Sequence, residues 1–235
     1  MAAELEYRIA GAERARDGGP VVVLLHGRGA DEGDLFGLAR QLPAGWVIVT
    51  PRAPFPAAPW GYGPGWAWYR YLGGNRPEPE GFEASLRSLA ALLGRLAATL
   101  GVEIGRVVLG GFSQGGTVST AYALAAAAGE LGDEAPRISR IVNLSGFLAD
   151  HPLVRAMPET VPGTHFFWGH GTADANIPFS LALEGRAALR RAGASLTTHD
   201  YPIGHWIDPR EIKDVAAWVE AVGASGTPPG GAGAR

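Results

Sequence analysis

Short apolar runs alternate with longer segments of helical periodicity along most of this chain. In the short runs, Val, Ile, Leu and aromatic residues fill successive positions, which is typical of parallel strands covered by helices on both faces. In the longer segments, apolar residues recur with the spacing of amphipathic helices. We therefore expect strands at 21–26, 46–51, 107–111, 141–145, 165–170 and 195–202, and helices at about 34–42, 81–100, 114–128, 179–193 and 209–222.

The alternation of strands and helices predicts an α/β fold with a mostly parallel, doubly wound sheet and helices on both of its faces. A weaker strand pattern at 5–10 predicts an antiparallel strand at one edge of that sheet. The length of 235 residues fits a single domain, which we assign to residues 1–223. The remaining segment, 224–235, reads ASGTPPGGAGAR and is predicted to be disordered, because it offers little apolar surface to bury.

One segment, FPAAPWGYGPGWAWYRY at 55–71, breaks the alternation, because its aromatic residues stand among Pro and Gly. It is too interrupted for a helix or a central strand. One interpretation is a surface loop whose rings pack on one another. The other is an apolar wall beside a binding cleft, because the segment follows the strand at 46–51 and ligands of open α/β sheets bind beyond the carboxyl ends of strands. The second interpretation makes Trp66, Trp68 and Tyr69 candidate substrate-binding residues.

The composition narrows the function classes. The chain has no cysteine, which excludes disulfides, thiolate metal ligands and a cysteine nucleophile. No histidine pair has a metal-binding spacing such as H-E-x-x-H, so we expect no metal and no organic cofactor. The net charge of −3 and the lack of Lys/Arg runs indicate neither a nucleic-acid partner nor an anionic membrane surface. No apolar run reaches the roughly 18 residues of a membrane span, so we expect no membrane insertion. The N-terminal segment lacks the apolar stretch of a signal peptide, so we expect a cytoplasmic protein.

The stretch VVLGGFSQGGTVSTAYALAAAAG at 107–129 places Ser113 between a strand pattern and a helix pattern, with two glycines on each side. G-x-S-x-G in this setting is the nucleophile elbow, a strained turn that lifts a serine hydroxyl above the edge of the sheet. Side chains two residues before and after the serine would collide there, which explains Gly111 and Gly115. The alternative is a serine that only caps the helix, which accounts for the hydroxyl but not for the glycines.

A serine hydroxyl needs a general base, and the base needs an orienting acid. His205 follows the last predicted strand, and Asp174 follows the strand at 165–170, so both loops lie at the same sheet edge as Ser113. The order Ser, Asp, His along the chain is that of α/β-hydrolases. For the acid, the alternatives are Asp150, which ranks second, and Asp200 and Asp208. The other histidines are assigned to packing or turns (His26, His165, His170 and His199) or to a solvated loop (His151).

An oxyanion intermediate needs two hydrogen-bond donors. One is expected to be the backbone N–H of Gln114, directly after the nucleophile. The other is expected to be the backbone N–H of Arg28, in the loop HGRGAD at 26–31 after the first buried strand, where flanking glycines allow a close approach.

The segments LLHGRGADEGDL, GGFSQGG, GHGTADANIP and GHWI occur in the order and at the spacing of the phospholipase/carboxylesterase family of serine hydrolases, which the chain resembles over about residues 20–222. The resemblance implies a minimal α/β-hydrolase core without a large cap domain. It implies hydrolysis of carboxylic ester or thioester bonds. Residue by residue, it supports a triad and two amide donors at Ser113, Asp174, His205, Arg28 and Gln114. The chain departs from the family at Arg28, a position that is often apolar, and in the density of Trp and Tyr at 55–71.

These observations predict a serine carboxylesterase that acts through an acyl-enzyme, with small, short-chain esters as substrates. An acyl-protein thioesterase or a lysophospholipase would use the same chemistry on a longer chain. A non-catalytic binding protein with this fold is the alternative from another class, and loss of a triad member would favour it. The expected partner is a small-molecule ester, and the sequence leaves a homodimer open.

Overall fold

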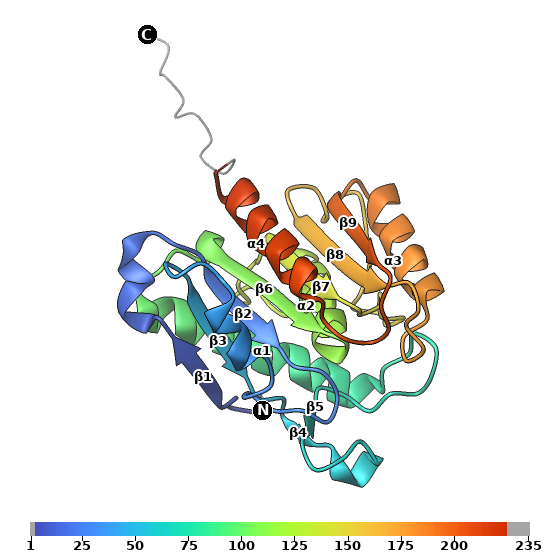
Figure 1. Ribbon diagram of the computed structural model, residues 1–235. Coiled ribbons are helices and arrows are strands. Elements are labelled where there is room, and N and C mark those ends of the chain that lie inside the picture. Colours follow the sequence, from blue (N-terminus) through green and yellow to red (C-terminus); the bar gives the residue numbers. More distant parts are fainter. Residues whose placement is uncertain (1–2, 225–235) are drawn as a thin grey trace.

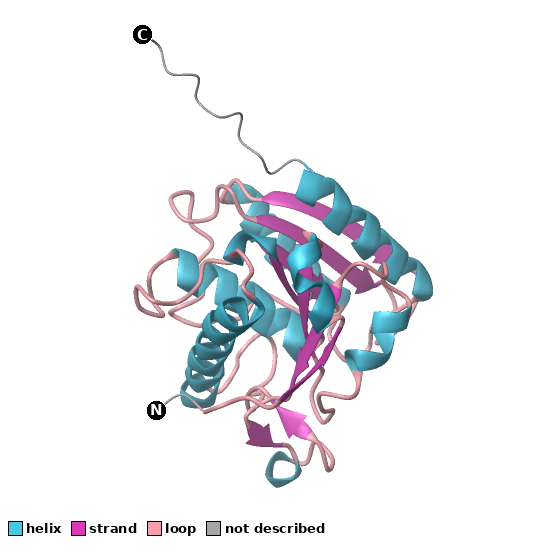
Figure 2. Ribbon diagram, turned by 90° about the vertical axis from the view of Figure 1, so that its left-hand side faces the viewer, coloured by secondary structure: helices cyan, strands magenta, loops and turns pink. Residues whose placement is uncertain are grey.

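A computed structural model describes residues 3–224 and places seven strands in one twisted sheet (Figures 1 and 2). Their order is β1-β3-β2-β6-β7-β8-β9. β1 pairs antiparallel with β3 at one edge, and the other neighbouring pairs of this sheet are parallel, which confirms the predicted α/β fold. The strands span Tyr7–Ala10 (β1), Val21–Leu25 (β2), Val47–Pro51 (β3), Val107–Phe112 (β6), Arg140–Leu144 (β7), His165–Gly171 (β8) and Ser195–Tyr201 (β9).

Helices cover both faces of the sheet, because successive residues of its central strands point to opposite sides. In β2, Val21 and Val23 belong to one apolar cluster, whereas Val22 and Leu24 belong to another. Residues of α1, α2 and α3 complete the first cluster, and residues of η2 and α4 complete the second. Figure 2 shows helices on either side of the sheet. The elements are η2 (Leu35–Arg40, a 3-10 helix), α1 (Pro79–Leu100), α2 (Gln114–Ala127), α3 (Phe179–Arg191) and α4 (Pro209–Ala224).

Parallel pairing brings loops from distant parts of the chain to one edge of the sheet. Arg28 follows β2, and Ser113 follows β6. Asp174 follows β8, and His205 follows β9. The carboxyl ends of parallel strands lie at the same edge, so the topology alone gathers these four residues near one another.

Segment 55–71 lies beside the main sheet and contributes no strand to it (Figure 1). Its strands β4 (Phe55–Pro56) and β5 (Trp66–Ala67) pair only with each other, and η3 (Ala58–Trp60) is a single 3-10 turn. The Phe55 and Trp60 rings pack at 5.6 Å between centroids near the surface, whereas Trp68 and Tyr69 are fully buried in the core.

The last described element, α4, ends at Ala224, one residue beyond the predicted domain boundary. Most of the predicted disordered tail, 225–235, lies outside the described residues. Within residues 3–224, no additional domain covers the carboxyl edge of the sheet. None of the helices in this part of the chain is long and apolar enough to cross a membrane.

Candidate active site

Ser113 stands on a strained turn between β6 and α2. Its backbone angles are φ 56° and ψ −117°, a left-handed region that residues other than glycine rarely adopt. A methyl group on Gly115 would lie 2.0 Å from the Leu25 carbonyl oxygen, and one on Gly111 would lie 2.5 Å from Gly115 itself. The glycines of the motif are therefore required by the close approach of α2 to β2 and β6. The Ser113 N–H donates to the Leu144 carbonyl at 2.8 Å, which fixes the turn to β7.

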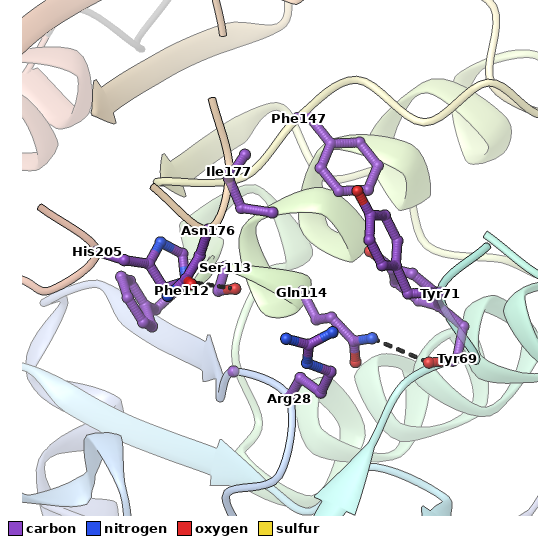
Figure 3. Close-up of a pocket in the computed structure, with 11 residues that line it drawn as sticks. Arg28, Tyr69, Tyr71, Phe112, Ser113, Gln114, Phe147, Asn176, Ile177 and His205 are labelled. Carbon is purple, nitrogen blue, oxygen red and sulfur yellow. Dashed lines mark hydrogen bonds between the residues drawn. The ribbon is translucent and has the colours of Figure 1, made fainter. Parts of the chain in front are cut away.

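The structure brings Ser113, His205 and Asp174 into one hydrogen-bonded chain (Figure 3 shows the Ser113–His205 pair). His205 Nε2 lies 2.9 Å from Ser113 Oγ, and His205 Nδ1 lies 2.6 Å from Asp174 Oδ2. A carboxylate can only accept, so the Nδ1–H donates to Asp174 and Nε2 is left to accept the serine proton. Asp174 Oδ1 accepts from the backbone N–H groups of Asn176 and Ile177 at 2.9 and 2.8 Å. Those two bonds hold the carboxylate in place.

The alternative acids have other partners. Asp200 pairs with Arg186 at 2.6 Å, and Asp208 pairs with Arg210 at 2.9 Å. Asp150 lies at a different pocket, beside His151. The expectation of a solvated His151 is wrong. The residue is only 6% exposed, and its ring packs against Phe82 at 5.2 Å between centroids.

Arg28 and Gln114 are the residues whose backbone N–H groups the sequence predicts as oxyanion donors. Within residues 3–224, neither N–H donates a hydrogen bond, and both residues line the pocket that contains Ser113 and His205. Gln114 is the first residue of α2, so its N–H also lies at the positive end of the helix. Such a pair of free amides can stabilise developing negative charge on a carbonyl oxygen.

His26 fixes the loop that carries the Arg28 amide. Burial lowers the pKa of His26, and the neutral ring accepts from the Ala53 N–H through Nε2 at 3.0 Å. Its Nδ1 lies 2.7 Å from the Gly27 carbonyl oxygen, and its own carbonyl accepts from the Trp68 indole at 2.9 Å. The loop is thus held from both sides before any ligand binds.

The pocket around Ser113 has a volume of about 190 Å³. Ser113 and His205 form one side of it in Figure 3, and Tyr69, Tyr71 and Phe147 form the other. Its remaining lining residues are Gly27, Arg28, Phe112, Gln114, Asn176 and Ile177.

Of the three aromatic candidates, only Tyr69 lines this pocket. Trp68 is fully buried in the core, with its indole N–H bonded to His26. The Trp66 ring is half-buried and lies under the guanidinium of Arg52, 5.1 Å from the centroid. The prediction that one or more of these rings contacts substrate is thus narrowed to Tyr69, because successive residues of an extended segment point to opposite faces and Trp68 faces the core.

The side chain of Gln114 is a feature that sequence reasoning missed. Its Oε1 accepts from the Trp68 N–H at 3.1 Å, and its Nε2 donates to the Tyr69 carbonyl at 2.9 Å (Figure 3). Ser85 of α1 donates to the Trp68 carbonyl. Gln114 thus joins the nucleophile turn to the aromatic segment. The glutamine in GFSQGG was the available signal, but its partners are about 45 residues away and no local pattern identifies them.

A buried carboxyl lies behind the His205 loop. Glu211 is 1% exposed, and burial raises its pKa to about 8. The Asp208 N–H donates to this carboxyl, and the Asp208 side chain accepts from the Arg210 N–H at 2.7 Å, as in a capping box. Oε1 of Glu211 has no hydrogen-bond partner among residues 3–224, and glycine at 169 leaves the space it occupies. This arrangement fixes the point at which the His205 loop enters α4.

No metal centre accompanies these groups in the described part of the chain. Residues 3–224 contain no cluster of three or more His, Asp or Glu side chains placed to bind an ion. The polar groups brought together here are a serine, a histidine and an aspartate in one hydrogen-bonded chain, beside the backbone N–H groups of Arg28 and Gln114. This set can perform acyl transfer without a cofactor.

Comparisons with known proteins identify the family of this chain. The family model described as Phospholipase/Carboxylesterase matches residues 10–222. Acyl-protein thioesterase 1 of Cryptococcus neoformans is 26% identical over 225 residues, covering 84% of this chain and 90% of that protein. Mouse lysophospholipase-like protein 1 is 26% identical over 185 residues, covering 73% of this chain and 71% of that protein.

Solved structures share the fold. Esterase PE8 superposes with a TM-score of 0.75 at 24% identity, covering 94% of this chain and all of that one. Acyl-protein thioesterase 2 of Zea mays gives 0.74 at 23% identity, with coverages of 92% and 98%. A carboxylesterase from Mesorhizobium loti gives 0.75 at 23% identity, with coverages of 92% and 94%. The chain is a hydrolase of the carboxylesterase and acyl-protein thioesterase type, and it belongs to the phospholipase/carboxylesterase family of α/β-hydrolases.

Proposed function

We propose that this protein is a serine carboxylesterase that hydrolyses small, short-chain esters through an acyl-enzyme. The observation that carries the proposal is the chain of contacts from Asp174 to His205 at 2.6 Å and from His205 to Ser113 at 2.9 Å. Ser113 and His205 line a pocket together with Arg28 and Gln114, whose backbone N–H groups donate no hydrogen bond within residues 3–224.

The reaction proceeds in two halves. Ser113 Oγ attacks the ester carbonyl while His205 Nε2 takes its proton, and the N–H groups of Arg28 and Gln114 stabilise the oxyanion. His205 then gives the proton to the leaving alcohol, and the acyl group remains on Ser113. A water molecule, deprotonated by His205, attacks the acyl-enzyme, and His205 returns the proton to Ser113 Oγ as the acid leaves. Asp174 holds the required tautomer and stabilises the imidazolium that forms in each half.

The size of the pocket supports a short substrate. Sites for drug-sized ligands are typically about 300–1,000 Å³, whereas this pocket is about 190 Å³. Tyr69 and Phe147 bound it on the side away from His205 (Figure 3). A long acyl chain would have to leave the pocket and follow the surface.

Acyl-protein thioesterase activity is the second candidate, favoured by the relatives that carry that name. The same residues would attack a thioester carbonyl, and His205 would protonate the leaving thiol. The two candidate functions differ in the length of the acyl chain that the pocket must accept. A series of esters and thioesters of increasing acyl length separates them, because the carboxylesterase proposal requires kcat/KM to be highest for short acyl groups.

Labelling with a fluorophosphonate tests the proposal most directly, since the reagent reacts with an activated serine. The wild-type protein should be labelled on Ser113, and Ser113→Ala should not be. Ser145, the other non-glycine residue with positive φ among those described, provides a matched control. Ser145→Ala should keep the label. A labelled Ser113→Ala protein, or an unlabelled wild type that is folded, would contradict the proposal.

A further inference from the structure

Arg28 is the one permanently charged residue among those that line the pocket of Ser113 and His205. Figure 3 shows its guanidinium at the pocket beside Gln114, on the side opposite Ile177. The amide of this residue has a place in the proposed reaction, but its side chain does not. A cation at a pocket for neutral esters therefore needs an explanation of its own.

The hydrogen-bond donors of this guanidinium are unused. Within residues 3–224, Arg28 forms no side-chain hydrogen bond and no ion pair. Two less exposed arginines are paired by contrast: Arg52 binds Glu32 through two bonds of 2.7 and 2.9 Å, and Arg186 binds Asp200 at 2.6 Å. A guanidinium offers five N–H donors in a planar fork that fits a carboxylate through two parallel bonds.

The two acidic residues closest to Arg28 in the sequence, Asp31 and Glu32, are engaged elsewhere. Glu32 pairs with Arg52, and Arg8 lies 3.7 Å from the same carboxylate. Asp31 Oδ1 accepts from the backbone N–H of Gly33 at 2.7 Å. No carboxylate of residues 3–224 forms an ion pair with Arg28, and an anion from outside can take that place.

The guanidinium is also held in position. It stacks over the Tyr62 ring at 4.5 Å from the centroid, which uses its flat face and leaves its N–H edge free. The next residue, Gly29, donates to the Trp66 carbonyl at 2.8 Å and has φ +81°. A methyl group there would lie 2.2 Å from the Tyr62 carbonyl oxygen, so this contact between the two loops requires glycine. Fixing the cation in advance reduces the entropy lost when an anion binds.

We propose that the natural ester carries a carboxylate, and that the guanidinium of Arg28 binds this group while Ser113 attacks the ester carbonyl. This inference rests on the proposed esterase activity and names its substrate class. The volume of about 190 Å³ limits the substrate to a small monoester of a dicarboxylic acid, or a small ester of a hydroxy acid. A neutral ester of the same size reacts by the same route but leaves Arg28 without a partner.

Two matched pairs of esters test this substrate class. On the acyl side, the 4-nitrophenyl monoester of succinate is compared with its methyl-capped diester. On the alcohol side, the acetate ester of 4-hydroxybenzoate is compared with that of methyl 4-hydroxybenzoate. The uncatalysed rate is subtracted in each case, because a neighbouring carboxylate accelerates hydrolysis in water. The quantity measured is the ratio of kcat/KM between the charged and the neutral ester.

For at least one pair, Arg28→Gln should lower this ratio by about five- to tenfold, a size typical of a charge-assisted contact that remains partly exposed. Arg28→Lys should keep part of the preference, because it retains the charge but not the fork. Added salt should lower the ratio for the wild type and not for Arg28→Gln. Arg70→Gln is the matched control, since Arg70 is exposed and lies near Tyr69 in the chain but does not line this pocket.

If Arg28→Gln leaves both ratios within about twofold of the wild type, the carboxylate proposal is overturned and the esterase proposal stands. If the wild type hydrolyses none of the four esters and Ser113 is not labelled by a fluorophosphonate, the esterase proposal itself fails. The first outcome is read from a ratio and the second from the absence of any reaction, so the two failures are distinguishable.

Discussion

The two sides of the pocket reach their places by different physical means. Ser113, Asp174 and His205 stand on loops at the ends of β6, β8 and β9, where parallel pairing gathers them at one edge. Tyr69 and Tyr71 come from a segment that contributes nothing to the main sheet. Its position depends on hydrogen bonds to Gln114, Ser85 and the loop after β2, and on burial of Trp68 and Tyr69.

The reacting groups and the aromatic residues that shape the substrate space are therefore held by different parts of the fold. The sheet positions the reacting groups whatever the aromatic segment does, because each strand is bonded along its length to its neighbours. The aromatic segment shapes the space that the substrate occupies, and a few side chains hold it. Changes on the first side should therefore affect rate, and changes on the second should affect stability or substrate choice.

The triad should give the largest effect. Ser113→Ala and His205→Ala should each lower kcat by about 10⁴- to 10⁶-fold, because the members of a triad act as a unit. The double variant should lose little more than either single one. Melting temperatures should change little, since the strands on both sides remain paired. Steady-state assays on one short ester provide the measurement, and a Ser113→Ala variant that keeps a tenth of the activity would show that the hydroxyl is not the nucleophile.

Trp68→Ala should lower stability and leave substrate choice unchanged. Trp68→Ala removes a fully buried ring and leaves the His26 carbonyl without its indole donor, at a cost of about 3–5 kcal/mol of unfolding free energy. Its ratio of kcat/KM between a short and a longer ester should match that of the wild type, because the ring does not line the pocket. If Trp68→Ala does not fold, Trp68→Phe replaces it in the test. Trp68→Phe should lose less stability and keep the same ratio of kcat/KM between the two esters. A changed ester ratio in a folded variant would place Trp68 among the selectivity residues after all.

Glu211 makes stability depend on pH on the triad side. Burial raises the pKa of Glu211 to about 8 from an ordinary 4.5, against the opposing hydrogen bond from the Asp208 N–H and with the charges of Asp208 and Asp214 adding to the rise. The folded state therefore holds this proton more tightly than the unfolded chain does. Its stabilising contribution is full below about pH 4.5 and is lost as the pH rises through 8.

Glu211→Gln should flatten this dependence, because an amide still accepts from the Asp208 N–H but does not ionise. Between pH 5 and pH 8 the wild type should lose about 1–3 kcal/mol more stability than the variant. Melting curves at several pH values measure it, with the exposed Glu220→Gln as control. Parallel curves for wild type and Glu211→Gln would mean that this carboxyl does not titrate between the two values.

The sequence predicts the sheet side of the pocket better than the aromatic side. All the strands of the main sheet and the positions of Ser113, Asp174 and His205 could be predicted, because apolar periodicity fixes each strand and topology fixes where its end lies. Whether Trp66, Trp68 or Tyr69 faces the substrate could not be predicted. That choice depends on the Gln114 and Ser85 contacts, which join residues far apart in the chain. Burial of His151 was missed for the same reason, since its neighbour Phe82 lies on α1.

Tyr69→Leu should give the smallest effect of these variants, and it tests most directly whether the aromatic segment determines substrate choice. Its ring lines the pocket and packs edge-on against Phe82 at 5.2 Å between centroids. Tyr69→Leu removes part of the wall and opens space for a longer substrate. Each additional methylene buried there is worth about 0.8 kcal/mol, or roughly fourfold in kcat/KM. The variant should therefore gain about fourfold in preference for a substrate one carbon longer, on either the acyl or the alcohol side.

Two ester series, lengthened on one side each, show which part of the substrate Tyr69 contacts. If neither series shifts while the melting temperature falls, Tyr69 supports the fold as Trp68 does, and selectivity belongs to Tyr71 and Phe147 on the same side of the pocket.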